Sequence, residues 1–209
     1  MARIGLSKPY AAVYSANGTN VSYTKRILLG KYTNIDLSLE NGDDNILYAD
    51  NGPAESDNTF SGGTVKITLD DMRPDAMADA LGLTSETIST TGLVTTSPKW
   101  LKFDDDQAVP YMALGGIIKL KVDGVVKFRA FVLEKIKFKN PGMSIATQGE
   151  TVEWQTPDME ADVFRSDDAK HTWHRISSLL DLESDAVAIL EDYLEVASPG
   201  PGDGDLEGT

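Results

Sequence analysis

Hydrophobic and polar positions alternate most regularly across residues 111–139, which predicts two long strands joined by a turn at Asp123–Gly124. Each strand therefore has one apolar face and one polar face. A two-residue turn would place Leu120 opposite Lys127 and mix the two faces. A three-residue turn with its glycine left-handed places Leu120 opposite Val126 instead, and this is the register that we expect.

A row of lysines lies along the polar face of this predicted hairpin. The expected register puts Lys119 opposite Lys127, and the row continues as Lys135, Lys137 and Lys139. Like charges directly across a ladder are destabilising, so an anionic surface against this row would be favourable. Two interpretations stay open. One is a solvated strand face that guards against edge pairing, and the other is a contact with an acidic patch on another copy of the chain.

Shorter runs of the same kind predict further strands and make the chain mainly β. An irregular lead-in that ends in a strand is expected over residues 4–15. The other expected strands are 21–29, 31–40, 64–69, 100–103, 151–156 and 159–165.

Two helices complete the expected fold. The first covers residues 70–83, where Asp71 can cap the amino end, Pro74 fits the first turn and Gly82 ends the helix. The second covers about residues 184–196 and has a wide apolar stripe.

Residues 41–63 differ from the rest of the chain because they form a long acidic connection with few apolar positions. Most connections are about four to six residues long, and much longer ones are usually functional or disordered. The apolar run Ile46, Leu47 and Tyr48 suggests an arm that buries its tip against another surface. A solvated surface loop is the alternative.

The length, net charge and cysteine content of the chain restrict its possible partners. The chain has 209 residues, a formal net charge of −14 and no cysteine. The acidic excess argues against a surface that grips duplex nucleic acid, although nucleic acid could still pass the protein without binding. No apolar run is long enough to cross a bilayer or to form a signal peptide. We expect one domain over residues 1–197 and a disordered acidic Gly/Pro tail over 198–209.

The sequence contains little that predicts catalysis. His171 and His174 could join Asp167 or Asp168 as metal ligands if they lay on a helix, but no third ligand of defined spacing accompanies them. Surface or packing roles are therefore expected for both histidines. Neither a phosphate-binding Gly-Lys-Ser/Thr string nor a Gly-x-Ser-x-Gly elbow is present, so we expect no enzyme activity and no cofactor.

Ordered short strings along the chain resemble one known family, the major tail proteins that form the tail tube of long, non-contractile-tailed bacteriophages. The resemblance extends from Ile4 to about Leu194 and does not include the tail after Ser198. The strings that carry it are Ile4–Tyr10, Asp36–Glu40, Leu47–Asp50, Glu55–Asp57, Phe60–Gly63, Phe128–Ala130, Lys135–Phe138, Thr147–Thr151 and Trp154–Pro157.

The resemblance implies a β-sandwich of the tail-tube type, with a short flanking helix and a C-terminal helix, assembled as a homohexameric ring. The rings would stack around the tape measure protein, meet the tail terminator and distal tail proteins, and later conduct DNA without sequence-specific binding. The protein would lie in the virion tail, and in the host cytoplasm during assembly. Contacts between subunits are expected at Ile46, Leu47, Tyr48, Asp50, Glu55, Asp57, Phe60, Lys135, Lys137 and Lys139.

Two other functions remain as alternatives. A carbohydrate-binding or adhesin-like β-sandwich would need exposed aromatic side chains, and Trp100, Trp154 and Trp173 are the candidates. Apolar neighbours make core packing the expected role of these tryptophans. A hydrolase would have to rely on His171 or His174 as its base.

Overall fold

The computed structural model describes residues 2–41, 45–49, 52–57, 60–87, 99–142, 147 and 156–195, with the backbone alone for residues 41–59. The fold is mainly β with two helices, as the sequence predicts. The predicted strand at 151–156 and the tail at 198–209 fall almost entirely outside the described residues.

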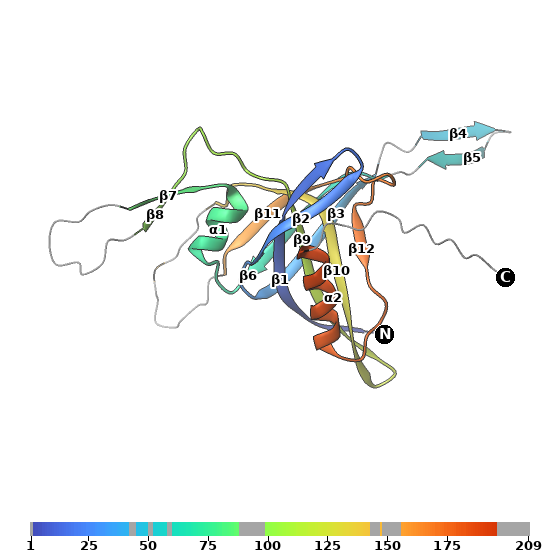
Figure 1. Ribbon diagram of the computed structural model, residues 1–209. Coiled ribbons are helices and arrows are strands. Elements are labelled where there is room, and N and C mark those ends of the chain that lie inside the picture. The colour runs from blue at the N-terminus through green and yellow to red at the C-terminus, as the bar shows by residue number, and fades with distance from the viewer. Residues whose placement is uncertain are drawn as a thin grey trace, which may run out of the picture.

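One antiparallel sheet contains eight of the strands (Figure 1). Across the sheet the order is β2 (Asn20–Leu28), β1 (Ala2–Asn17), β9 (Met112–Val122), β10 (Val125–Phe138), β11 (Asp158–Phe164), β6 (Phe60–Leu69) and β3 (Tyr32–Asn41). The short β12 (His174–Ile176) also pairs with β10. Two separate hairpins are formed by β4 (Asn45–Ala49) with β5 (Gly52–Asp57), and by β7 (Thr84–Thr87) with β8 (Lys99–Lys102).

The hairpin of β9 and β10 forms as predicted, but its expected register is wrong. Val122 pairs with Val125 across a two-residue turn, and Leu120 pairs with Lys127. Asp123 and Gly124 both have positive φ, 49° and 84°, as a type I′ turn requires, and this turn matches the right-handed twist of the strands. The turn geometry therefore outweighs the separation of faces, and the expected pairing of Lys119 with Lys127 does not form.

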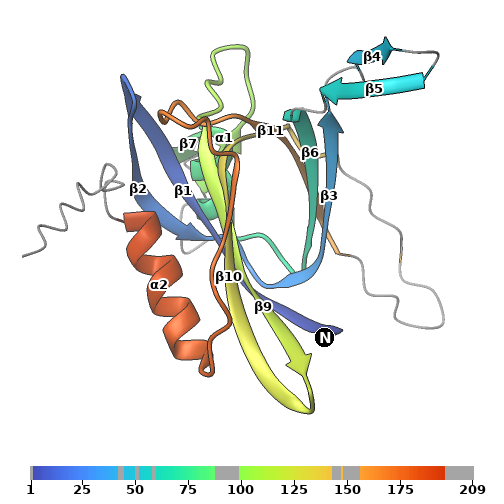
Figure 2. The same cartoon turned by 90° about the vertical axis from the view of Figure 1, so that its right-hand side faces the viewer.

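The sheet folds over on itself, so that the layer containing β3 and β6 faces the layer containing β1 and β9 (Figure 2). The space between the layers holds the main hydrophobic core, in which Val65, Ile67 and Leu114 are fully buried. Tyr32 crosses this core and donates a hydrogen bond from its hydroxyl to the Gly115 carbonyl, 3.2 Å away.

The second helix, α2 (Glu183–Glu195), covers the outer face of β1, β2, β9 and β10. Ala186, Leu190 and Leu194 are buried against this face, whereas Ile189 is 46% exposed, so the apolar stripe is narrower than predicted. A Cβ added at Gly115 would lie 2.6 Å from Leu190 Cδ1, so the strand approaches the helix closely where glycine permits it.

The first helix, α1 (Pro74–Leu81), is shorter than the expected span of residues 70–83. It begins at Pro74 and is ended, as expected, by Gly82, whose φ of 63° is left-handed. The predicted cap at Asp71 is wrong. Its carboxylate accepts the adjacent Met72 N–H, and the N-cap position is occupied by Arg73 without a side-chain hydrogen bond.

The amino-terminal segment is one long strand, β1, and the irregular lead-in expected there is wrong. The pairing of β1 with β9 shifts between Ser7 and Tyr10, and Lys8 has a positive φ of 59°. A bulge at this point accommodates Pro9, which has no N–H to contribute to a ladder.

Candidate assembly surfaces

The two histidines do not share a helix face. His171 lies in a turn with a φ of 53°, and its Nδ1 is 3.1 Å from the Ser166 carbonyl oxygen. His174 lies on β12 and stacks against Trp173, with ring centroids 5.2 Å apart. The helical spacing considered for a metal pair is therefore wrong. Within the described residues no three His, Cys, Asp or Glu side chains gather in a way that could hold a metal ion.

A buried carboxylate, Glu134, forms the most concentrated polar cluster of the described residues. It is 2% exposed, and it accepts hydrogen bonds from Tyr193 Oη at 2.8 Å, from Arg175 Nε at 2.6 Å and from the Tyr23 hydroxyl. Burial, together with the negative charge of Glu134, raises the pKa of both tyrosines. Because these donors lie on β2, β12 and α2, the hydrogen bonds to Glu134 connect these three elements to β10.

The predicted arm is a hairpin rather than an unstructured loop. Strands β4 and β5 form their own two-stranded sheet and extend away from the eight-stranded sheet in both views (Figures 1 and 2). In this β4–β5 arm Ile46 pairs with Ser56 and Leu47 with Glu55. An isolated two-stranded hairpin is marginally stable in water. The side chains of Ile46, Leu47, Tyr48, Glu55 and Asp57, and all of Asp50, lie outside the described part, so their contacts stay a prediction.

Phe60, at the base of the arm, packs within its own chain. Its ring stacks on Trp173 with centroids 4.5 Å apart and an angle of 9° between the planes. Both residues pack against the main core, so Trp173 has the packing role expected for it. Trp100 does not have the packing role expected for it, because it is 58% exposed on β8. Trp154 lies outside the described residues.

Within the chain, the lysine row (Lys135, Lys137 and Lys139) contacts acidic and aromatic side chains. Lys135 Nζ lies 2.6 Å from an Asp167 oxygen, and the hydrogen bond from Lys135, with a second from Tyr14, lowers the pKa of that carboxyl. Lys137 Nζ lies 5.4 Å from the centroid of the Tyr111 ring.

At the end of the row, Lys139 Nζ contacts Glu160 at 2.6 Å and Asp162 at 2.8 Å, and these hydrogen bonds raise the pKa of Lys139. An outside acidic surface is therefore not needed to neutralise Lys135 or Lys139. Contact of this row with another subunit stays a prediction.

The outer face of β3, β6 and β11, which we call the bare face, carries only polar side chains along most of its length. Asp36 lies opposite Lys66, and Lys66 lies opposite Glu160. The carboxylates on this face are Asp36, Glu40, Asp158, Glu160 and Asp162. No helix or strand of the described residues covers the face (Figure 2). Such a face is stable in water, because an antiparallel sheet needs only one apolar side.

The edge of the sheet at β3 is also open. Within the described residues β3 pairs only with β6, which leaves one row of its backbone N–H and C=O groups without a strand partner. Leu37 and Leu39 point to the same side as the core, yet Leu39 is 45% exposed. The alternation in the sequence predicts their side of the strand correctly, but it carries no signal that the sandwich is open at this end.

No protein-family model matches this chain, and no curated protein has a significantly similar sequence. None of the described helices combines the length and apolar composition needed to span a bilayer.

Proposed function

We propose that this chain is the major tail protein of a long, non-contractile phage tail, a structural subunit that forms six-membered rings stacked into a hollow tube. The ordered strings described above support this proposal. The tape measure protein would fill the tube during assembly, and DNA would pass through it during ejection.

The observation that carries the proposal is the β4–β5 arm. It extends from the end of β3 and β6 as a separate hairpin, in the segment expected to reach a neighbouring subunit. Since an isolated hairpin is marginally stable, a surface outside the subunit body would stabilise it. The open edge of β3 supports the same function, because an unpaired strand accepts a strand from another chain.

The bare face is the surface that we assign to the channel wall. Its five carboxylates, Asp36, Glu40, Asp158, Glu160 and Asp162, outnumber the three lysines at the same surface, which are Lys66, Lys137 and Lys139. A wall with excess negative charge repels phosphate, so DNA would slide past without binding. The opposite outer face lies under α2 and cannot line a channel without loss of that helix.

Electron microscopy of the purified protein in negative stain tests the proposal directly. Over a series of protein and salt concentrations we expect rings and then tubes with a central hole. Particles that remain monomeric at high concentration in every salt, with no ring intermediate, would contradict it. So would a particle in which the β4–β5 arm contacts no neighbour and no inter-subunit sheet lines the hole.

A further inference from the structure

The hairpin of β7 and β8 is a second arm, at the opposite side of the body from the β4–β5 arm (Figure 1). Its strands pair only with each other among the described residues, Glu86 with Trp100 and Thr87 with Lys99. One edge of β8 is therefore unpaired. As a short hairpin outside the main sheet, it has the same need for a partner surface as the first arm.

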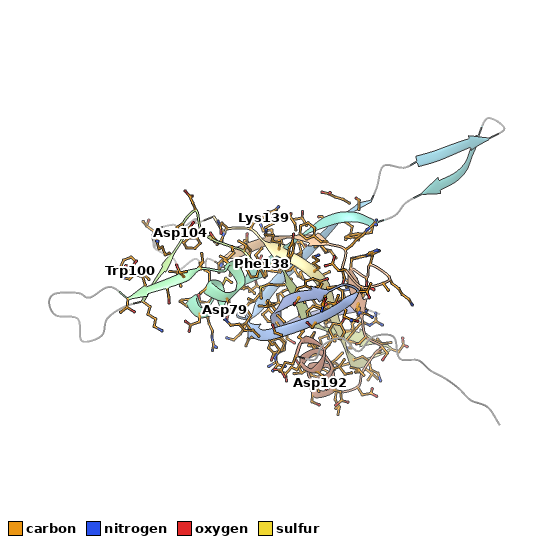
Figure 3. All side chains as sticks on the ribbon, turned by 45° about the horizontal axis from the view of Figure 1, so that its top comes forward. Asp79, Trp100, Asp104, Phe138, Lys139 and Asp192 are labelled. Atoms are coloured by element: carbon orange, nitrogen blue, oxygen red, sulfur yellow. The ribbon has the colours of Figure 1, made fainter. Side chains whose placement is uncertain are left out.

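The exposed side chain of Trp100 favours a protein as the partner of this β7–β8 arm. It is 58% exposed and lies away from the core in Figure 3. Phe103, just after β8, is 51% exposed. Tryptophan is enriched among the residues that dominate binding energy at protein interfaces, because one side chain buries a large apolar area.

The open edge of β3 has the complementary features. Leu37 and Leu39 expose apolar surface on one face of this edge strand, and Glu40 lies on the other face. Within the described residues neither the Glu40 carboxylate nor the Lys99 ammonium has an ion-pair partner. Glu40 on β3 and Lys99 on β8 are therefore exposed side chains of opposite charge, and each lies next to an exposed apolar side chain in its strand.

Strand alternation makes these features fit in one register. If β8 is added antiparallel to β3 with Trp100 opposite Leu39, then Lys99 lies opposite Glu40 on the other face. A parallel arrangement would instead place Lys99 opposite Ser38 and leave Glu40 unpaired. With Trp100 opposite Leu39, the apolar match and the charge match are satisfied together only in the antiparallel arrangement. Parallel addition with Trp100 opposite Leu37 would place Lys99 opposite Asp36 instead, and the cross-link to Asp36 distinguishes the two registers.

We propose that β8 of one copy adds to the β3 edge of a neighbouring copy, with Trp100 against Leu39 and Lys99 beside Glu40. The contact is heterologous, since each copy uses a different surface at its two sides, and such contacts generate rings or filaments. The inference rests on the proposed function in that it requires copies to assemble. It assigns the contact to an arm that the family resemblance does not single out.

Cross-linking between single-cysteine variants tests the register, because the natural chain contains no cysteine. Assemblies mixed from Lys99→Cys and Glu40→Cys chains are treated with a short bismaleimide. We expect a covalent dimer, and at least fivefold less dimer from Lys99→Cys with Asp36→Cys. Asp36 shares a face with Glu40 but lies four positions along β3, about 13 Å away. Equal yields from the two mixtures would overturn the register.

Charge exchange tests whether the contact drives assembly. Lys99→Glu and Glu40→Lys should each raise the concentration needed for assembly severalfold, and the two changes together should restore most of the loss. Lys170→Glu, at another exposed lysine, is the matched control and should have little effect. No rescue in the double variant would contradict the pairing of Lys99 with Glu40.

Trp100→Ala separates this inference from the proposed function. If wild-type chains form tubes and the variant forms them equally well, the β8 contact is wrong while the tube proposal stands. If wild-type chains never assemble, both fail. Binding of glycans on an array that is lost in Trp100→Ala would assign the exposed tryptophan to carbohydrate recognition instead and overturn the inference.

Discussion

The outer face of β1, β2, β9 and β10 lies under α2, whereas the bare face of β3, β6 and β11 has no covering element among the described residues (Figure 2). The two faces belong to one sheet. On the first, the strands place Tyr10, Ala12 and Ile117 outward, and α2 buries them. On the second, acidic side chains, hydroxyls and lysine replace the apolar residues, and water can solvate the strand face.

This contrast predicts that the covered side determines the stability of the fold, whereas the bare side determines assembly. Apolar burial stabilises the covered side, so substitutions there are expected to lower the free energy of unfolding. The bare side contributes little burial on its outer surface but adjoins the open β3 edge and the β4–β5 arm. Substitutions there are expected to change assembly and leave folding almost unaffected.

The largest expected effect comes from deleting Asp44–Asp57. The ladder of β3 with β6 reaches Asn41 and Phe60, so the remaining residues can close it as a short hairpin loop. We expect the deletion to abolish tube growth in electron micrographs while the urea unfolding midpoint stays close to that of the wild type. Normal tubes from this variant would show that the β4–β5 arm has no assembly role, and early unfolding would show that it stabilises the body.

On the covered side, Leu190→Ala should be strongly destabilising. The side chain is fully buried between α2 and the sheet, and its loss leaves a cavity, which costs about 2–5 kcal/mol. Ile189→Ala is the matched control on the same helix, because Ile189 is 46% exposed, and we expect a loss of less than about 1 kcal/mol. Urea denaturation of both variants measures the difference, and similar losses would mean that α2 does not pack as described.

Alkaline pH should lower the free energy of unfolding through two buried tyrosines on the covered side. Burial and Glu134 raise the folded-state pKa of Tyr23 and Tyr193 above the ordinary value of 10.0. The unfolded chain therefore releases these protons first, and their contribution to stability, complete below about pH 10, is lost as pH rises above it. The expected slope is about 1.4 kcal/mol per pH unit for each tyrosine.

Tyr23→Phe provides the check on this slope. The substitution removes one titrating group, so the unfolding free energy measured between pH 9 and 11 should fall less steeply than in the wild type. At pH 7 the same variant should be less stable, because Glu134 loses a hydrogen-bond donor. An unchanged alkaline slope would indicate that Tyr23 is not buried beside Glu134.

The smallest expected effect on folding lies on the bare face. Asp36→Asn keeps the shape of an exposed side chain and an oxygen that can accept the hydrogen bond from Asn34, so it should change the unfolding free energy by less than about 0.5 kcal/mol. If this face lines the channel, tubes of the variant should bind a short DNA duplex more strongly at low salt than wild-type tubes do. A large loss of stability would show that the face is packed against something.

The sequence predicts well what depends on local pattern. Alternation locates the strands of the central hairpin, and Gly82 locates the carboxyl end of α1, whereas the amino end of α1 lies four residues after the expected start. It fails where two local rules conflict, as at Asp123–Gly124, where the preferred turn sets the register despite the mixed faces. It also misses β12, because a three-residue strand that contains His174 and Arg175 has no alternation long enough to detect.

The candidate surfaces are harder to predict, because exposure depends on contacts between distant segments. Leu39 and Trp100 look like core residues in the sequence, and only the arrangement of β3 and β8 shows that neither is covered by the described residues. Conversely, the lysine row looks uncompensated until β11 brings Glu160 and Asp162 beside Lys139. Neither the exposure of Leu39 and Trp100 nor the ion pairs of Lys139 can be predicted from neighbouring residues in the sequence.

The pairing of β1 with β9 has a consequence for biosynthesis. β1 ends at Asn17 and its partner begins at Met112, so the ribosome must add almost half of the chain before that ladder can start to form. At about 5–20 residues per second this takes roughly 5–20 seconds. During that interval β2 is the only ladder partner available to the nascent β1, so the other edge of β1 stays unpaired.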